Sequence, residues 1–483
     1  MYTKILRVTG LDGKGQWRAF LVAGGHGATH WIIATFYILV PYIRSDLELS
    51  YAEAGVFASV FFCSSFAANA LIDLFEKNKL NPKHVGRIYM GTESALDASK
   101  PSATYATDLV EKYFEKEYGE RCLKNCDIAD LTFACIGGVD ALQNTIDWIS
   151  RNPGKKAIVV SSDLSKYELN STGEYTQGAG AVALLISENP SILSIENQWG
   201  VATKSENDFF KPRRAFDKTT LINEIISKLK LNISDKEFEK NLSDSSFWNN
   251  NSDIIEVFKD EPIFDGQFSN SCYVDRMQEA FAHFQEQKKT NFLNDWNHLI
   301  FHLPYAFHGR RMIFNNWLKW VKDDPIYKDL TNEVGPETNE DFNKKAYKSS
   351  LYKEFVEKKI CPGEKASSSI GNMYSASVFM SLLSMLNYHF DINNELAGEK
   401  VGFISYGSGS KAKIFHGIIQ DDWKSKIKTS KLFDSLQTRK EISFSNYENL
   451  HKNKDVSPLS NRNARFSHTD KEINSKGYRR YKI

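Results

Sequence analysis

A cysteine at a strand-to-helix junction is the first chemically informative residue of this sequence. In TFACIGGVDALQNTIDWI (residues 132–149), Cys135 precedes Gly137 and Gly138, and apolar residues then recur at helical spacing. A helix N-terminus favours thiolate, which is the nucleophilic form of cysteine. The glycines give a substrate room and leave N–H groups free for an oxyanion. The pattern indicates a nucleophile, and a small cysteine that only packs in a core is an equal alternative.

Three other segments place reactive side chains after apolar stretches. Glu93 follows a predicted strand in GTESALDASKP, and His302 follows a short apolar stretch in IFHLPY. Asn372 and Tyr374 lie at a glycine-marked helix start in SSSIGNMYSASVF. Taken singly, these residues are better explained as a helix-end charge, a core histidine and a helix cap. Together with Cys135 they provide a nucleophile, a base and an electrophilic pair, which suits carbon–carbon bond formation on acyl thioesters.

The elements that would position these residues are those of an α/β protein. Residues 67–79 and 103–118 have helical spacing, whereas 155–162 and 179–187 are apolar runs of strand length. Residues 401–406 precede a GSGS turn and a second apolar run, which predicts a hairpin.

Composition excludes several classes of protein. The chain has 483 residues and a formal net charge of +1, so it carries no field for unspecific nucleic-acid binding. Its apolar content of 41% excludes wholesale disorder. Six scattered cysteines do not form a disulfide framework, and this favours a reducing, cytoplasmic setting. Cys122 and Cys126 lack two further ligands of suitable spacing, so no metal site is expected.

The first 66 residues differ from the remainder. Residues 19–43 and 54–72 carry no charge, and each stretch is close to the ~20 residues that span a bilayer as a helix. The segment ILVPYIRSDLELSYAEAGVFASVFF resembles the first hairpin of a major-facilitator transporter. A pair of buried core helices is the alternative. Membrane association is expected only if this hairpin inserts.

From about residue 67 onward the chain resembles the 3-hydroxy-3-methylglutaryl-coenzyme A synthases of the mevalonate pathway, which belong to the thiolase superfamily. The resemblance rests on GTE, ACIGG, SDLSKYELNSTGEYTQGAGAVALLI, NDFFKP, HLPY, IGNMYSAS and ISYGSG, in family order. It implies that Cys135 accepts the acyl group, Glu93 is the general base and His302 is the active-site histidine. The supporting and substrate-binding positions that it implies are Asp163, Tyr167, Thr176, Asp208, Asn372, Tyr374 and Ser405.

The resemblance also implies a fold, an organisation and a reaction. The fold expected is a five-layered α/β/α/β/α arrangement of two related halves, at 67–190 and 191–420. An insertion at 213–260 and a polar extension at 421–483 complete the organisation. The implied reaction is an acyl transfer that joins acetyl-coenzyme A to acetoacetyl-coenzyme A. It needs no metal or other cofactor, and a homodimer is expected.

The sequence departs from the family pattern at two places. Phe307 stands where the family has a lysine near coenzyme A, and Arg310 and Arg311 are the candidates to hold its phosphates instead. The family's opening strand and helices, expected before Ala67, are replaced by the transporter-like segment, which suggests a fusion or assembly artefact. Two alternatives follow: a β-branching synthase that acts on carrier-protein-bound acyl groups, and an inactive chain with a membrane-inserted N-terminus.

Overall fold

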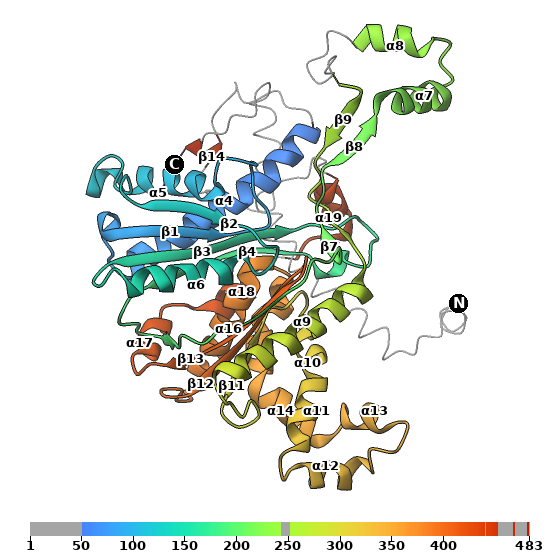
Figure 1. The fold of residues 1–483 in the computed structure, drawn as a ribbon. Coiled ribbons are helices and arrows are strands. Elements are labelled where there is room, and N and C mark those ends of the chain that lie inside the picture. Colours follow the sequence, from blue (N-terminus) through green and yellow to red (C-terminus); the bar gives the residue numbers. More distant parts are fainter. Residues whose placement is uncertain (1–50, 243–251, 440, 453–466, 469–480, 483) are drawn as a thin grey trace.

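The computed structural model describes residues 51–242, 252–439, 441–452, 467–468 and 481–482 (Figure 1). For residues 51–62 it describes the helix and not the side chains. The described chain is built on two larger sheets whose faces are covered by helices.

The first sheet has four strands in the order β2-β1-β3-β4. β1 is parallel to both of its neighbours, and β4 is antiparallel to β3. β3 is buried along nearly all of its length, because helices cover both faces of the sheet and its apolar run faces them. The strands are β1 (Val85–Gly91), β2 (Asp127–Leu131), β3 (Lys156–Ser165) and β4 (Gly178–Ile186).

The second sheet has the order β11-β12-β13-β5, and β6 also pairs with β13. β11 and β12 are parallel, whereas β12 and β13 form the antiparallel hairpin that the VGFISY and GSGS segments predict. The strands are β5 (Leu193–Ile195), β6 (Gly200–Thr203), β11 (His298–Phe301), β12 (Lys400–Gly407) and β13 (Lys411–Ile419).

Three layers of helices enclose the two sheets. α4 (Tyr51–Lys77) and α5 (Ser102–Tyr118) cover the outer face of the first sheet, and α9 (Gly266–Gln287) covers the outer face of the second. α6 (Gly137–Ser150) packs on the inner face of the first sheet and α16 (Ser377–Asp391) on the inner face of the second. The expected α/β/α/β/α fold is therefore confirmed.

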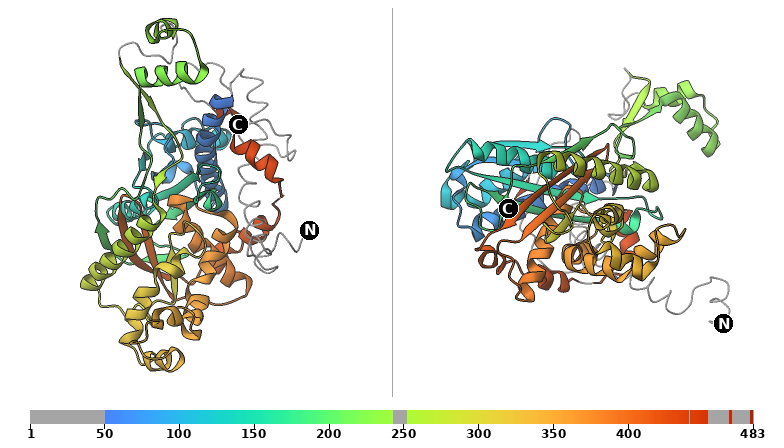
Figure 2. Two further views of the ribbon diagram at one scale, coloured as in Figure 1. Left: turned by 90° about the vertical axis from the view of Figure 1, so that its right-hand side faces the viewer. Right: turned by 60° about the horizontal axis from the view of Figure 1, so that its bottom comes forward.

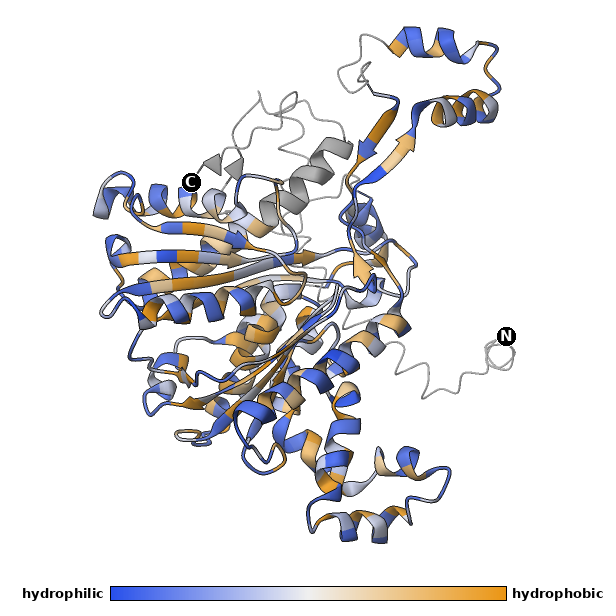
Figure 3. Ribbon diagram, in the orientation of Figure 1, coloured by the Kyte–Doolittle hydropathy of each residue, from blue (hydrophilic) through white to orange (hydrophobic). Residues whose placement is uncertain are grey.

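The core between the sheets is apolar on both sides. Val139 and Leu142 of α6 belong to one buried cluster with Phe379 of α16 and with Phe403 and Phe415 of the hairpin. The rings of Phe403 and Phe415 stack with centroids 4.6 Å apart. Figure 3 shows that the apolar residues gather on the strands and on the helix faces that meet them. Cys135 lies at one end of this central layer, just before α6 begins.

α4 packs into the protein core. Ala67, Leu71, Ile72 and Phe75 are all buried against α5 and the first sheet, and Ser162 Oγ of β3 donates a hydrogen bond to the carbonyl of Cys63. No helix of the described residues is long and apolar enough to cross a bilayer. The interpretation of residues 54–72 as a membrane span was therefore wrong, because this helix uses its apolar face to cover the sheet. The stretch 19–43 lies outside the described residues.

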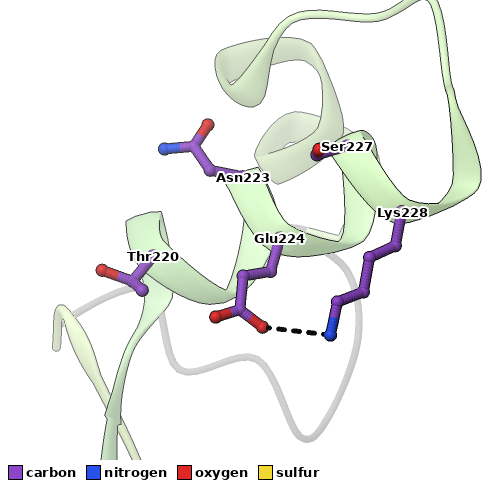
Figure 4. A pocket seen from close by; sticks show the side chains of 5 residues that line it. All are labelled: Thr220, Asn223, Glu224, Ser227 and Lys228. Carbon is purple, nitrogen blue, oxygen red and sulfur yellow. Dashed lines mark ion pairs between the residues drawn. The ribbon is translucent and has the colours of Figure 1, made fainter.

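The predicted insertion forms a projecting arm (Figure 1 and Figure 2). It consists of β8 (Arg214–Asp217), α7 (Lys218–Leu229), α8 (Asp235–Leu242) and β9 (Ile254–Val257), and β8 pairs with β9. Its root is the pairing of β7 (Phe209–Phe210) with β10 (Ile263–Phe264). A shallow hollow on α7, shown in Figure 4, is lined by polar residues of that helix, with Glu224 and Lys228 ion-paired at 3.8 Å. It is part of the arm and contains none of the predicted site residues.

The remaining elements surround these layers. α10 to α14 form a helical lobe at the opposite end of the molecule from the arm (Figure 2). The 3₁₀ helices of the described residues are Pro82–His84 (η1), Glu174–Thr176 (η2) and Tyr374–Ala376 (η3). The other elements are α10 (His308–Met312), α11 (Phe314–Lys322), α12 (Tyr327–Val334), α13 (Phe342–Ala346), α14 (Ser350–Lys359), α15 (Cys361–Ile370), α17 (Trp423–Ile427), α18 (Leu432–Gln437), α19 (Phe444–His451), β14 (Ser467–His468) and β15 (Tyr481–Lys482).

Candidate active site

Cys135 lies on a strained turn between β2 and α6. The residue before it, Ala134, has a φ of +41°, a left-handed conformation that is unfavourable for any residue with a side chain. Residues other than glycine rarely adopt this backbone conformation unless the surrounding structure enforces it. Residues strained in this way cluster at functional sites. Cys135 is 7% exposed, so the turn presents its thiol to a nearly closed interior.

The glycines after Cys135 serve helix packing. A Cβ atom on Gly138 would lie 2.2 Å from Ser161 Oγ of β3 and 2.9 Å from the ring of Phe379. One on Gly137 would lie 2.6 Å from the carbonyl oxygen of Leu131. The expectation that these glycines leave room for a substrate is therefore not met, because protein atoms already fill that space. They allow α6 to approach the sheet closely enough to fix the position of the thiol.

The thiol of Cys135 donates a hydrogen bond to Glu93. Its Sγ lies 3.1 Å from Glu93 Oε2, and this hydrogen bond joins the end of β1 to the turn before α6. Burial, followed by the negative charge of Glu93, raises the pKa of the Cys135 thiol well above its usual value. The resting cysteine is thus a neutral thiol, which corrects the expectation of a thiolate at the helix N-terminus. Its neighbour Glu93 is the acceptor for its proton.

Glu93 is a buried carboxylate with an altered affinity for protons. Burial raises its pKa, Lys211 opposes that rise, and the charge of Asp163 adds to it, so the net direction is upward. Lys211 Nζ lies 3.4 Å from Glu93 Oε1, the oxygen that does not accept from Cys135. A carboxyl group with a raised pKa in a dry site suits the work of a general base.

Asp163 holds the loops of the site together. Its carboxylate accepts hydrogen bonds from Thr92 Oγ1 at 2.8 Å, from the Glu93 backbone N–H at 2.8 Å and from the Ser375 backbone N–H at 2.9 Å. The Ser375 hydroxyl also donates to it. Asp163 is completely buried, so its oxygens position the backbone beside Glu93.

His302 lies at the end of β11 as a buried, neutral imidazole. Burial lowers its pKa to about 3, and its Nδ1 has no hydrogen-bond partner among the described residues. The hydroxyl of Tyr273 donates to the His302 carbonyl at 3.3 Å. Burial, followed by the negative charge that Cys135 carries when ionised, raises the pKa of Tyr273, which thus contacts His302 and is influenced by Cys135. A buried nitrogen without a protein partner is available to a substrate oxygen.

Four of the predicted binding residues form one wall of the site. Tyr374 has a φ of +42° and packs its ring against Phe209 at the root of the arm. Asn372 Oδ1 accepts from the Tyr374 N–H at 2.8 Å, so this side chain caps the turn. The Asn372 N–H in turn donates to the carbonyl of Thr176 at 2.8 Å. Tyr167 lies near Cys135 and Glu93, whose charges contribute, after burial, to its raised pKa.

Asp208 and Ser405 belong to the support of the β12–β13 hairpin. Asp208 is fully buried and accepts from Tyr406 Oη at 2.8 Å, from the Gly409 N–H at 2.8 Å and from Ser269 Oγ at 3.1 Å. It therefore joins the hairpin turn to α9. Ser405 is buried on β12, and its Oγ has no hydrogen-bond partner within the described residues. This hydroxyl is, like His302 Nδ1, a buried polar atom without a protein partner in the described part of the chain.

The two predicted phosphate-binding arginines contact residues outside this group. Arg310 forms an ion pair with the buried Glu364 and lies over the ring of Phe307, 4.8 Å from its centroid. Its charge is therefore already neutralised. Arg311 is exposed and donates to Tyr305 Oη at 2.7 Å. Of the two, Arg311 is the one that keeps its charge accessible to solvent.

Comparisons with known proteins identify the family. The sequence profile described as "Hydroxymethylglutaryl-coenzyme A synthase N terminal" matches residues 49–191, and the one described as "Hydroxymethylglutaryl-coenzyme A synthase C terminal" matches residues 238–478. This chain belongs to the hydroxymethylglutaryl-coenzyme A synthase family. The family match begins at residue 49, which is earlier than residue 67, where the sequence motifs first revealed it. The transporter-like resemblance of the N-terminal segment finds no support.

Individual relatives agree with this family. The hydroxymethylglutaryl-CoA synthase of Haloferax volcanii is 29% identical over 403 residues, covering 80% of this chain and 79% of that protein. The synthase of Enterococcus faecalis is 25% identical over 385 residues, covering 80% and 77%. A solved structure, "MvaS in complex with 3-hydroxy-3-methylglutaryl coenzyme A", has a TM-score of 0.64 at 24% identity and covers 87% of each chain. At that identity the structural match shows the fold alone.

The structure adds site residues that the sequence interpretation missed. Lys211 and Thr92 stand inside the NDFFKP and GTE motifs, so their proximity to Asp208 and Glu93 in the chain was a usable signal. Ser375 stands inside IGNMYSAS, directly after Tyr374, so it carried the same signal, whereas Tyr273 is brought to His302 only in the folded chain. Among the described residues, no group of three or more His, Cys, Asp or Glu side chains could hold a metal ion.

Proposed function

We propose that this member of the synthase family condenses acetyl-coenzyme A with acetoacetyl-coenzyme A, giving 3-hydroxy-3-methylglutaryl-coenzyme A for the mevalonate pathway. The observation that carries the proposal is the hydrogen bond from Cys135 Sγ to Glu93 Oε2 inside a buried site. The curated relatives with this activity in their names cover about four-fifths of the chain, which supports it further. The enzyme is thus an acyltransferase.

The first step is acetylation of Cys135. Its thiol passes a proton to the Glu93 carboxylate as the sulfur attacks the carbonyl carbon of acetyl-coenzyme A. A new thioester bond forms to Cys135, and the bond to coenzyme A breaks. The leaving thiolate takes the proton from Glu93, so free coenzyme A departs and Glu93 is again a carboxylate.

The second step forms the carbon–carbon bond. Glu93 removes a proton from the methyl group of the acetyl-cysteine, and the resulting carbanion attacks the ketone carbon of acetoacetyl-coenzyme A. The ketone oxygen becomes an alkoxide, which takes up the proton from Glu93. His302, as a neutral imidazole with a free ring nitrogen, is suited to hold this oxygen by a hydrogen bond. Asn372 and Ser405 are the further groups that we assign to substrate binding.

Hydrolysis completes the cycle. Water attacks the thioester carbon of Cys135, the bond to sulfur breaks, and the product leaves with a new carboxyl group while the thiol regains its proton. These steps use only side chains, water and two thioesters, and we propose that the enzyme needs no cofactor. All six cysteines are free, which supports a reducing compartment such as the cytoplasm.

A homodimer is part of the proposal, supported by the edge of the first sheet. β2 is one of the two edge strands, and its residues are exposed or half-exposed. An uncovered edge strand presents backbone groups that pair readily with another strand. A second copy of the chain would supply that strand. Size-exclusion chromatography with light scattering tests the oligomeric state directly.

The carrier-protein alternative is less well supported. Structures of the curacin pathway synthase with a donor carrier protein resemble this chain at TM-scores of 0.60 and 0.61, but at 19% and 20% identity these show the fold alone. The deciding experiment compares turnover of acetoacetyl-coenzyme A with that of acetoacetyl-carrier protein. The proposal fails if only the carrier-bound substrate is consumed, or if mass spectrometry finds no acetyl group on the peptide that contains Cys135.

A further inference from the structure

The two oxygens of Glu93 have different partners. Oε2 accepts the thiol proton of Cys135, whereas Oε1 faces Lys211 Nζ at 3.4 Å. This is the one ion pair that the described residues give to Glu93. The side chains of both partners are nearly buried, at 11% exposure for the lysine and 6% for the glutamate. A buried ammonium group is costly unless an opposite charge faces it, so the pairing is specific.

Lys211 approaches Glu93 from the other half of the molecule. It follows β7 at the root of the arm, whereas Glu93 follows β1 in the first sheet. Its Nζ lies 4.6 Å from the centroid of the Tyr374 ring, which fixes the direction of the side chain. The lysine is therefore held between an aromatic face and the candidate base. The position of this charge depends on correct docking of the two halves.

We propose that Lys211 is the counter-ion that keeps Glu93 in its carboxylate form, ready to accept a proton from the Cys135 thiol and from the acetyl methyl group. The inference rests on the proposed function for the second of these two protons. Lys211 is thus a positioning residue that acts through Glu93. It makes no contact with the reacting carbon atoms in this role.

The charges around Glu93 determine the sign of the effect. Asp163 on β3 is negative and, with burial, disfavours a second negative charge at Glu93, as does any charge on the Cys135 sulfur. Lys211 opposes these effects, and the charges of Glu93, Asp260 and Asp163 in turn raise the pKa of Lys211 against the effect of its burial. Removing the lysine charge leaves burial and Asp163 opposed only by the hydrogen bond from Cys135. The pKa of Glu93 must then rise further, so a smaller fraction of Glu93 is carboxylate at any given pH.

The main test is the pH dependence of kcat in Lys211→Met, compared with the wild type. The acidic limb of the profile should move upward by about one pH unit or more, and activity should return in part at alkaline pH. Lys211→Arg, which keeps the charge, should retain the wild-type limb. Lys288→Met is the matched control, because it removes a lysine that pairs with Glu196 away from the site, and its limb should not move.

An unmoved acidic limb overturns the inference. If Lys211→Met loses the same fraction of kcat at every pH, with an unmoved acidic limb, the lysine is only a packing residue. Circular dichroism checks that each variant is folded. Should the methionine variant unfold, Lys211→Gln, which keeps a polar end of similar length, replaces it in the same comparison.

A second measurement separates this inference from the proposed function. The rate of Cys135 alkylation by iodoacetamide, followed by mass spectrometry, depends on proton transfer to Glu93 but needs no condensation. Lys211→Met should shift the acidic limb of this rate upward as well. If the wild type makes no product yet shows the shift, the proposed function fails and the role of Lys211 stands. If the wild-type enzyme is active and the alkylation profile of Lys211→Met is unshifted, the proposed role of Lys211 is refuted and the proposed function stands.

Discussion

Asp163 accepts a hydrogen bond from the backbone N–H of Ser375 at 2.9 Å, and this contact joins β3 of the first half to η3 of the second. The same carboxylate fixes the backbone of Glu93. A single buried side chain therefore sets the position of the candidate base relative to the wall that contains Tyr374. The arrangement makes the site dependent on how the halves dock.

Asp163→Asn should weaken both stability and catalysis. An amide offers one accepting oxygen, so some of the donors on Thr92, Glu93 and Ser375 lose their partner, at an expected cost of about 2–4 kcal/mol in unfolding free energy. Urea denaturation measures the cost. Asp108→Asn, which removes an exposed surface charge, is the control and should change stability by less than about 1 kcal/mol. A wild-type unfolding curve for Asp163→Asn would contradict the bridging role.

Cys135→Ala should abolish incorporation of radiolabelled acetyl groups, because no other described thiol donates a hydrogen bond to the Glu93 carboxylate. Glu93→Gln should slow acetylation as well as condensation, since the geometry makes Glu93 the acceptor of the thiol proton. Cys361 is half-exposed and remote from Glu93 in the sequence. Cys361→Ala should therefore leave acetyl incorporation intact. Full acetylation of Glu93→Gln at the wild-type rate would show that another group takes the thiol proton.

Gly138→Ala should destabilise the protein. The new methyl group would meet Ser161 Oγ at 2.2 Å and the Phe379 ring at 2.9 Å, so α6 must move away from the sheet, at a cost of about 1–3 kcal/mol or more. Gly266→Ala is the matched control at the start of another helix, where the nearest atom is 4.0 Å away. Thermal unfolding compares the two. Equal melting temperatures would mean that the close packing of α6 is not required.

His302 should make the protein sensitive to acid. Burial lowers its pKa to about 3, below the ordinary value of about 6.5, so the unfolded chain binds a proton that the folded chain does not. The contribution of His302 to stability is therefore lost as the pH falls from about 6.5 towards 3. His302→Gln should flatten this decline, whereas His84→Gln, at an exposed position, should not. The free energy of unfolding is measured by urea denaturation over a pH series. If the prediction fails, its decline with falling pH is the same in His302→Gln as in the wild type.

The helix α19 should influence substrate binding through the loop of Tyr167. His451 Nε2 lies 2.9 Å from the Tyr167 carbonyl oxygen, and Tyr447 Oη donates to Glu174. Tyr447→Phe should loosen this loop and raise KM for acetoacetyl-coenzyme A more than it lowers kcat. Phe444→Ala, which changes a 69% exposed residue of the same helix, is the control. An unchanged KM in Tyr447→Phe would exclude a role for α19 at the site.

The local sequence determined the elements and the family. Strand-length apolar runs and helical spacing predicted β3, β4, α5 and the β12–β13 hairpin within a few residues, because these patterns depend on near neighbours along the chain. The motifs around Glu93, Cys135 and His302 identified a synthase of the thiolase superfamily. Their order along the chain carried this information, so no contact between them was needed to find it.

The tertiary structure decided what the individual groups are doing. The charge of the Cys135 thiol depends on burial and on Glu93, 42 residues away in sequence, and these outweigh the local effect of the helix N-terminus. Position 138 must be glycine because Ser161 and Phe379 leave no room for a side chain there, and no local sequence pattern shows that these two residues are its neighbours. The apolar face of α4 suits a membrane or a core equally well, and only the presence of a sheet to cover selects the core. Ionisation, close packing and burial are properties of three-dimensional neighbours, and those neighbours come from distant parts of the chain.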